Sequence, residues 1–80
     1  MHFVYILKSV GLPERFYVGS TADLEARVAD HNAGRSPHTS KHRPWTLKWY
    51  CAFDSKARAE EFETYLKSAS GRAFQKKHLA

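Results

Sequence analysis

The opening stretch of the chain, residues 2–8, constrains the fold most, because it contains a run of five apolar residues, four of which are aromatic or β-branched. Residues of these types favour strands, and a run without polar alternation is typical of a strand that is buried on both faces. A buried strand needs neighbouring strands to pair with and helices to cover it. We therefore expect residues 2–8 to lie inside a sheet that is flanked by helices.

Two more segments have the composition of strands. Residues 15–19 follow a turn-like link at residues 11–14, and the shortness of that link predicts a hairpin with the first strand. Tyr5 and Tyr17 would then lie on neighbouring strands, about 5 Å apart if they are directly opposite. Residues 45–53 form the third predicted strand.

Within that third strand, alternation places Trp45, Leu47 and Trp49 on one face. The residues between the first helix-forming pattern and this strand, 33–44, are rich in Gly, Ser, Pro, Thr and basic side chains. This composition is typical of an exposed loop.

Three helices complete the prediction. The first begins after Thr21, a favourable N-cap, and ends near Asn32; the second covers residues 56–69 after Asp54 or Ser55; the third is short, basic and covers residues 72–79. We expect Ser70-Gly71 to separate the last two helices. The predicted order is β-β-α-β-α-α, which is an α+β fold with a three-stranded antiparallel sheet flanked by helices.

The length of 80 residues and the hydrophobic content of 42% are sufficient for one small domain, residues 1–80. The single Cys51 excludes an internal disulfide and a zinc site built from several cysteines. The N-terminus lacks the layout of a signal peptide, and no apolar run is long enough to cross a bilayer. We therefore expect a cytoplasmic location and no membrane partner.

The formal net charge of +5 favours a polyanionic partner, with nucleic acid as the first candidate. Basic residues gather in the loop that precedes the third strand and again near the C-terminus, and no acidic residue interrupts either group. The expected nucleic-acid-binding residues are Arg35, Lys41, Arg43, Arg72 and Lys76.

Arg27 and His31 are four residues apart in the first predicted helix, so they share one face of it. Together with Tyr5 and Tyr17 they would offer proton acceptors and a fixed cation, which attack of water on a phosphodiester can use. Taken one at a time, these residues also fit ordinary structural roles. Tyr5 fits a core tyrosine, Arg27 a surface partner of Asp23, and His31 a helix-end histidine.

The ordered set of motifs resembles the GIY-YIG nuclease domain, which is named for two tripeptides on adjacent strands. Here the tripeptides read Val4-Tyr5-Ile6 and Tyr17-Val18-Gly19, and Arg27 follows eight residues after the glycine. The match continues through residues 43–47 and a late helix with Glu63, and it covers nearly the whole chain. The chain resembles the small stand-alone bacterial branch of that superfamily and is similar to the nuclease domain of excinuclease C.

The resemblance implies a divalent-metal-dependent endonuclease that hydrolyses DNA phosphodiester bonds, with RNA as the other candidate substrate. It implies Tyr5 or Tyr17 as the general base and Arg27, helped by His31, at the scissile phosphate. Glu63 would be the sole protein ligand of one Mg²⁺ or Mn²⁺ ion. A single carboxylate completed by phosphate oxygens and water is a usual arrangement for Mg²⁺.

The chain departs from the family pattern at three positions. Val4 replaces the glycine of the first tripeptide, and Ser20 stands where several members have a lysine after the second. Gln75 stands twelve residues after the expected metal ligand, where many members have an asparagine. Because Gln75 can still donate and accept hydrogen bonds, we include it among the expected catalytic residues.

Two other classes of function remain open at this point. The chain could be a non-catalytic nucleic-acid-binding module, or a nuclease subunit that depends on a partner. The catalytic interpretation requires four side chains to face one cleft, namely Tyr5, Tyr17, Arg27 and Glu63. Since 80 residues leave little room for a domain that reads a target, sequence preference is expected to be low or supplied by a protein partner.

Overall fold

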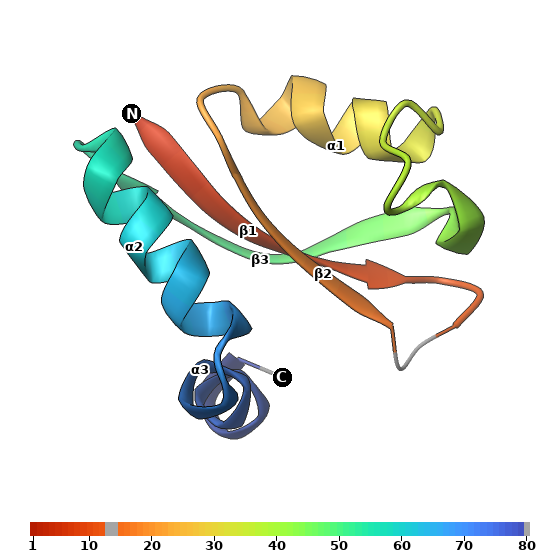
Figure 1. Ribbon diagram of the computed structural model, residues 1–80. Coiled ribbons are helices and arrows are strands. Elements are labelled where there is room, and N and C mark those ends of the chain that lie inside the picture. The colour runs from red at the N-terminus through yellow and green to blue at the C-terminus, as the bar shows by residue number, and fades with distance from the viewer. Residues whose placement is uncertain (13–14, 80) are drawn as a thin grey trace.

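A three-stranded antiparallel sheet in the order β2-β1-β3 lies at the centre of the computed structural model, which describes residues 1–12 and 15–79 (Figure 1). The α+β class and the element order expected from the sequence are confirmed. The predicted turn at residues 11–14 lies partly outside the described residues. The strands are β1 (His2–Ser9), β2 (Phe16–Thr21) and β3 (Trp45–Phe53). The α-helices are α1 (Leu24–Asn32), α2 (Lys56–Lys67) and α3 (Ala69–Phe74). Two shorter helical segments are the 3₁₀ helix η1 (Ser40–His42) and the π-helical turn η2 (Gln75–Leu79).

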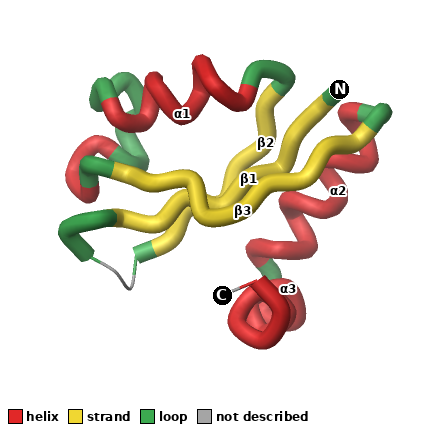
Figure 2. Tube along the Cα trace, turned by 180° about the vertical axis from the view of Figure 1, so that it is seen from behind, coloured by secondary structure: helices red, strands yellow, loops and turns green. Residues whose placement is uncertain are grey.

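Strand β1 occupies the middle of the sheet, which explains why its sequence is apolar on both faces. Helix α1 covers one face, and α2 with α3 covers the other (Figures 1 and 2). Val4 and Ile6 pack on the α2 side with Ala59 and Leu66. The alternate residues of β1 point the other way, so the sheet has a separate core on each face.

The core on the α1 side contains Tyr5, Leu7 and Trp45, with Leu24 and Val28 of α1 packed against it. Burial of such side chains stabilises a fold by about 1.5–3 kcal/mol each. The apolar side chains are therefore divided between two small cores, one on each face of the sheet. The functional groups described below lie between these cores, at the free edge of β2.

A β-bulge overturns the prediction that three residues of β3 share one face. Ile6 pairs with Trp49 while the next residue, Leu7, pairs with Leu47, so Lys48 is left between two ladder positions. The extra residue reverses the alternation of side chains at that point. Trp45 and Leu47 consequently lie on the α1 side of the sheet, whereas Trp49 packs against Phe62 on the α2 side.

The ends of the helices are set by side-chain caps, two of which differ from the prediction. Asp23, rather than Thr21, caps α1 by accepting a hydrogen bond of 3.1 Å from the backbone N–H of Ala26. Ser55 caps α2, as one of the two expected alternatives. Ser68 separates α2 from α3, earlier than the predicted break at Ser70-Gly71, and its hydroxyl accepts from the Gly71 N–H.

Gly71 therefore lies inside α3 instead of ending a helix, and it is buried. A Cβ at this position would collide with the carbonyl oxygen of Tyr65. The glycine is needed because α3 turns back closely against the end of α2. Among the described residues, no helix combines the length and the apolar character needed to cross a membrane.

Candidate active site

The site is built around Gly19 of the edge strand, which lies directly opposite Tyr5 in the β1–β2 ladder. A Cβ at Gly19 would approach the Tyr5 hydroxyl to 2.5 Å and Cε2 of Tyr17 to 3.0 Å. The missing side chain leaves room for the Tyr5 ring to extend over the edge strand. The ring centroids of Tyr5 and Tyr17 consequently lie 6.4 Å apart, near the edge of the sheet.

His31 in the last turn of α1 joins the two tyrosines. Its side chain is completely buried, its Nε2 lies 2.8 Å from the Tyr5 hydroxyl, and its ring centroid lies 4.9 Å from that of Tyr17. The other ring nitrogen, Nδ1, lies 2.7 Å from Oγ1 of Thr39. Every polar atom of the imidazole therefore has a partner, as a buried ring requires.

The segment that supplies Thr39 corrects the prediction of a wholly exposed loop. Ser36 and Thr39 are buried, because residues 33–44 fold back over the end of α1. The indole N–H of Trp45 donates to the Thr39 carbonyl at 2.9 Å, and the Asn32 side chain binds both backbone groups of Trp45. These hydrogen bonds hold Thr39 in place beneath the imidazole.

The buried pair is neutral near pH 7. Burial raises the pKa of Tyr5 to about 12, although the interaction with the Arg27 guanidinium acts in the opposite direction. Burial, supported by the positive charge of Arg27, lowers the pKa of His31 below its ordinary value. His31 lies in the last turn of α1, as the helix-end interpretation expects, but its burial disfavours the protonated form of the imidazole.

Arg27 lies one turn before His31 on α1, at the edge of this buried group. Its side chain is 36% exposed, and its Nη1 is 3.9 Å from the Asp30 carboxylate. The ion pair with Asp23 considered from the sequence is not formed, because Asp23 caps the helix. A guanidinium that interacts with the Tyr5 hydroxyl and still meets solvent can bind an anion next to the tyrosines.

Glu63 reaches the same edge strand from the opposite face of the sheet. Its Oε1 accepts a hydrogen bond of 2.7 Å from the Ser20 hydroxyl, and its Oε2 accepts one of 2.8 Å from Lys67 Nζ. Burial acts to raise the pKa of Glu63, but the hydrogen bonds from Lys67 and Ser20 outweigh it, so the pKa lies below its ordinary value. Glu63 is therefore an anion near pH 7, and its charge raises the pKa of Tyr5.

Lys67 connects the two halves of the site around the edge of β2. Besides binding Glu63, its ammonium nitrogen lies 5.9 Å from the centre of the Tyr17 ring. Tyr17 thus contacts His31 from one face of the sheet and Lys67 from the other.

Glu63 is suited to a metal ion for which it would be the one protein ligand. Among residues 1–12 and 15–79, no three His, Cys, Asp or Glu side chains are grouped to hold an ion. The Glu63 carboxylate accepts two hydrogen bonds and keeps further lone pairs for a cation. A hard cation with water and phosphate oxygens as its remaining ligands fits such a group.

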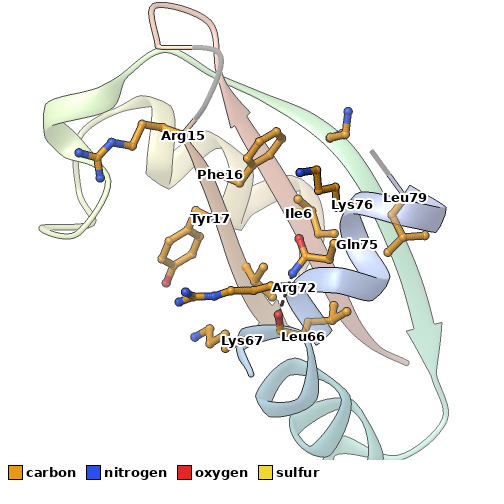
Figure 3. A pocket seen from close by; sticks show the side chains of 12 residues that line it. Ile6, Arg15, Phe16, Tyr17, Leu66, Lys67, Arg72, Gln75, Lys76 and Leu79 are labelled. Carbon is orange, nitrogen blue, oxygen red and sulfur yellow. Dashed lines mark hydrogen bonds between the residues drawn. The ribbon is translucent and has the colours of Figure 1, made fainter. Parts of the chain in front are cut away.

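The other expected catalytic residue, Gln75, lies apart from the tyrosine–histidine contacts. Its Nε2 donates a hydrogen bond of 2.8 Å to the Leu66 carbonyl, which joins η2 to the end of α2. Gln75 lines a pocket together with Tyr17, and Arg72 and Lys76, two of the expected nucleic-acid-binding residues, line the same pocket (Figure 3).

The remaining three basic residues of that expected set lie elsewhere, in or beside the segment that follows α1. Arg35 forms a hydrogen-bonded ion pair of 2.8 Å with Asp30, and Lys41 is exposed in η1. The Arg43 guanidinium lies over Gly34, whose φ of 80° belongs to the left-handed region, and its Nε donates to the Ser40 carbonyl. The structure thus divides the expected basic residues between two regions.

Sequence reasoning missed three contributors to the site. Thr39 carries no local signal, and Ser20 was noted only as a departure from the family pattern, because the partners of both hydroxyls are distant in the chain. Lys67 had a signal, because it follows Glu63 by four residues on a helix, but that spacing indicates only a surface pair. Its second contact, with Tyr17, depends on how α2 crosses the edge of the sheet.

This arrangement defines a small α+β domain with two tyrosines, an arginine and a histidine at one strand edge and a glutamate beyond it. The model of the GIY-YIG catalytic domain family matches residues 1–78. The chain therefore belongs to the GIY-YIG nuclease family, as the resemblance of its motifs indicated.

Several small relatives match over nearly their whole length. A UPF0213 protein of Streptococcus pyogenes is 34% identical over 98% of this chain and 84% of its own, and a UPF0213 protein of Halobacterium salinarum is 40% identical over 88% and 90%. The structure-specific endonuclease subunit SLX1 of Candida dubliniensis is 39% identical over 95% of this chain but only 28% of its own.

A solved structure has the same fold. The solution NMR structure of a UPF0213 protein from Bacillus halodurans matches with a TM-score of 0.57 and 31% identity, over 95% of this chain and 80% of that one. The expected resemblance to small bacterial GIY-YIG proteins is confirmed by the Streptococcus and Bacillus relatives.

Proposed function

We propose that this protein is a divalent-metal-dependent endonuclease that hydrolyses phosphodiester bonds in DNA, with RNA as the alternative substrate. The observation that carries the proposal is the arrangement of Tyr17 at the edge of β2, with neutral His31 on one side and the Lys67–Glu63 pair on the other. It brings a tyrosine hydroxyl, cations and a carboxylate to one strand edge. Membership of the GIY-YIG family supports the reaction class.

Tyr17 is the better candidate for the group that activates water. Tyr5 is 1% exposed, whereas Tyr17 lines an open pocket and its hydroxyl points away from the sheet (Figure 3). A free tyrosine has a pKa near 10, so it acts as a base near neutral pH only with the help of nearby positive charge. Lys67 and Arg72, which line the same pocket, would supply that charge.

Tyr5, His31 and Thr39 would hold Arg27 and the second tyrosine in position. The Thr39 hydroxyl lies 3.5 Å from the Ser36 carbonyl, so it can donate there and accept from Nδ1–H of the imidazole. This assignment leaves Nε2 as the acceptor of the Tyr5 hydroxyl proton. Thr39 is then a positioning residue, because it sets the tautomer of His31 without reaching the reacting atoms.

Arg27 would stabilise the phosphate as its negative charge increases during attack of water on phosphorus. Removal of one such preorganised donor typically costs about two to three powers of ten in rate. Glu63 would hold one Mg²⁺ or Mn²⁺ ion. When bound, the ion supplies Lewis-acid stabilisation of the negative charge on the departing oxygen.

The proposal also accounts for the departure from the family pattern at Ser20. Where several members have a lysine after the second tripeptide, this chain has a hydroxyl that binds the Glu63 carboxylate. Lys67 brings an ammonium group to the same carboxylate from α2. We propose that Lys67 takes over the role of that cation.

The test is cleavage of plasmid, single-stranded and branched DNA, and of a single-stranded RNA, by the purified chain with Mg²⁺, Mn²⁺ or EDTA. We expect strand breaks with either ion, none with EDTA, and none with the Glu63→Ala variant. Glu60→Ala is the matched control, because Glu60 is an exposed acid on the same helix. Absence of cleavage with every ion and every substrate would overturn the proposal for the isolated chain.

A second candidate is a nucleic-acid-binding module or a subunit that becomes active with a partner. It is favoured by the occupation of both Glu63 oxygens by Ser20 and Lys67, which a metal ion must share or displace. The SLX1 relative is itself named as a subunit. Binding without cleavage in the test above would favour this candidate, and a cytoplasmic location is proposed for either.

A further inference from the structure

A pocket with a volume of about 1010 Å³ lies beside the candidate active site (Figure 3). We call it the C-terminal groove, because α3 and η2 form one wall and the start of β2 forms the other. Tyr17 and Lys67 belong to the groove as well as to the candidate active site. A ligand in the groove would therefore be continuous with one held at that site.

The charged residues that line the groove are all basic. Five of its lining residues are basic, and none of those lining it among the described residues is acidic. In Figure 3 the Arg72 side chain points from α3 toward Tyr17, Lys76 lies near Phe16, and the Arg15 guanidinium points outward from the groove. The basic residues are Arg15, Lys48, Lys67, Arg72 and Lys76. A row of cations along one groove is suited to a chain of phosphates.

The floor of the groove is apolar, which phosphates alone would not require. Val18, Leu66 and Leu79 contribute to it. Phe16 stands at its rim, 46% exposed, with the Lys48 ammonium 5.7 Å from the ring centre. Lys48 is the residue that the β3 bulge leaves between two ladder positions, so the bulge contributes directly to this contact.

From these features we infer that the C-terminal groove binds a single-stranded segment of nucleic acid next to the cleaved bond, with a base stacked on Phe16. A paired duplex keeps its base faces inside, so it would leave the aromatic ring and the apolar floor without contacts. Unpaired bases expose those faces, and aromatic stacking with a basic track is the usual mode of single-strand binding. The inference rests on the proposed nuclease function and names its substrate class, a single strand or a branched molecule with an unpaired arm.

Binding in EDTA tests the groove separately from catalysis. Fluorescence anisotropy would compare a labelled oligo-dU of twelve nucleotides, oligo-rU of the same length, a blunt hairpin duplex, and an oligomer that lacks bases at its central positions. We expect both single strands to bind more tightly than the hairpin and than the abasic oligomer. The ratio of oligo-dU to oligo-rU affinity identifies whether DNA or RNA is preferred.

The Phe16→Ala variant should weaken oligo-dU binding about fivefold or more, which corresponds to the loss of one stacked base. The abasic oligomer should bind the variant and the wild type equally. Phe16→Tyr should restore binding, because it retains the aromatic face. Tyr50→Ala is the matched control: Tyr50 is 52% exposed and lies in a different pocket.

Three results would overturn the inference: equal or tighter binding of the hairpin, an unchanged oligo-dU affinity in folded Phe16→Ala, or competition by polyglutamate as strong as that by oligo-dU. Far-UV circular dichroism would establish that the variant is folded. If Phe16-dependent binding of single strands is found but no ion supports cleavage, the proposed nuclease function is contradicted and single-strand binding in the groove is supported. If duplex DNA is cleaved and Phe16→Ala has no effect on binding, single-strand binding in the groove is contradicted and the nuclease function is supported.

Discussion

The two faces of the sheet use opposite physical means to position functional groups. On the α1 face, Tyr5, His31 and Thr39 form a buried chain of neutral hydrogen bonds. On the α2 face, Glu63 and Lys67 form a charged pair that remains partly exposed. Both sets meet at the free edge of β2. This strand therefore separates a buried network of neutral groups from a partly exposed pair of charged groups.

The comparison shows why each group lies where it does. A neutral imidazole can be buried only if both nitrogens have partners, and burial then holds its position and lowers its pKa. A charged carboxylate that is meant to bind a cation must keep access to water and ions, since full burial of an unpaired charge is very costly. We therefore propose that the buried network on the α1 face positions side chains, whereas the exposed Glu63 on the α2 face would bind the ion.

The largest expected effect is on the rate of cleavage. Measuring it in variants of each face tests whether both faces act on the same reaction. Arg27→Ala and Glu63→Gln should each reduce the cleavage rate by about two to three powers of ten. High Mn²⁺ should partly restore Glu63→Gln, because the lost charge weakens ion binding, but it should not restore Arg27→Ala. Initial rates measured across a Mn²⁺ titration check this prediction. Equal rescue of both variants would contradict the separation of roles between the faces.

The next largest expected effect is on the free energy of unfolding. It compares the loss of a buried hydrogen bond on the α1 face with the loss of an exposed ion pair on the α2 face. Thr39→Val removes one partner of the buried imidazole and should lower the free energy of unfolding by about 1–3 kcal/mol. Lys67→Met removes one exposed ion pair and should lower it by about 0–1 kcal/mol. Urea unfolding of the two variants gives both values. A larger loss for Lys67→Met than for Thr39→Val would reverse the comparison.

The two faces should also respond to acid in separate pH ranges. His31 has a lowered pKa in the folded state, so the unfolded chain takes up its proton first and stability falls as the pH drops below about 6.5. Glu63 also has a lowered pKa in the folded state. Its contribution to the free energy of unfolding is therefore present above pH 4.5 and is lost only as the pH falls below that value.

Unfolding free energies measured from about pH 7.5 to 3.5 check these two ranges. One proton contributes a slope of at most about 1.4 kcal/mol per pH unit. His31→Leu should remove part of the slope just below about pH 6.5, and Glu63→Gln should remove part of the slope below pH 4.5. An upper-range slope that His31→Leu leaves unchanged would mean that the imidazole protonates as easily when folded as when unfolded.

The smallest expected effect compares the basic residues near each face. Neutralising Arg72 and Lys76 should reduce the salt dependence of single-strand binding by about 0.7 in log–log slope for each phosphate that is no longer neutralised. Neutralising Arg35 and Lys41 should change it less, because Arg35 is already paired with Asp30. Affinities measured between about 50 and 300 mM salt would give both slopes. A larger change for the Arg35 and Lys41 variant would move the nucleic-acid footprint to the α1 side.

Some of this molecule could be predicted because it depends on neighbours in the chain. The apolar run of residues 2–8 indicated the central strand, and β3 has the predicted bounds 45–53. The four-residue spacing of Arg27 and His31 placed them on one face of α1, where Arg27 interacts with Tyr5 and His31 binds it. Helix and strand periodicity determine such relations whatever surrounds the element.

The caps and the bulge were not predictable in the same way. Thr21 and Asp23 are both good caps, and Asp23 caps the helix because β2 extends through Thr21. The bulge at Lys48 is decided by how β3 pairs with β1, and it moved Trp49 to the face opposite Trp45. Local composition contains no information on which residue a ladder will skip.

The sequence by itself determined the order of elements, the family and the candidate residues, because those follow from local patterns and an ordered motif. Only the tertiary structure joined Tyr5 to His31 across 26 residues and Ser20 to Glu63 across 43. It also gave Lys67 a second contact with Tyr17 and assembled the C-terminal groove from several elements that are distant in the chain. These contacts depend on how helices cross the edge of a sheet, which packing of the whole chain decides and no short segment can specify.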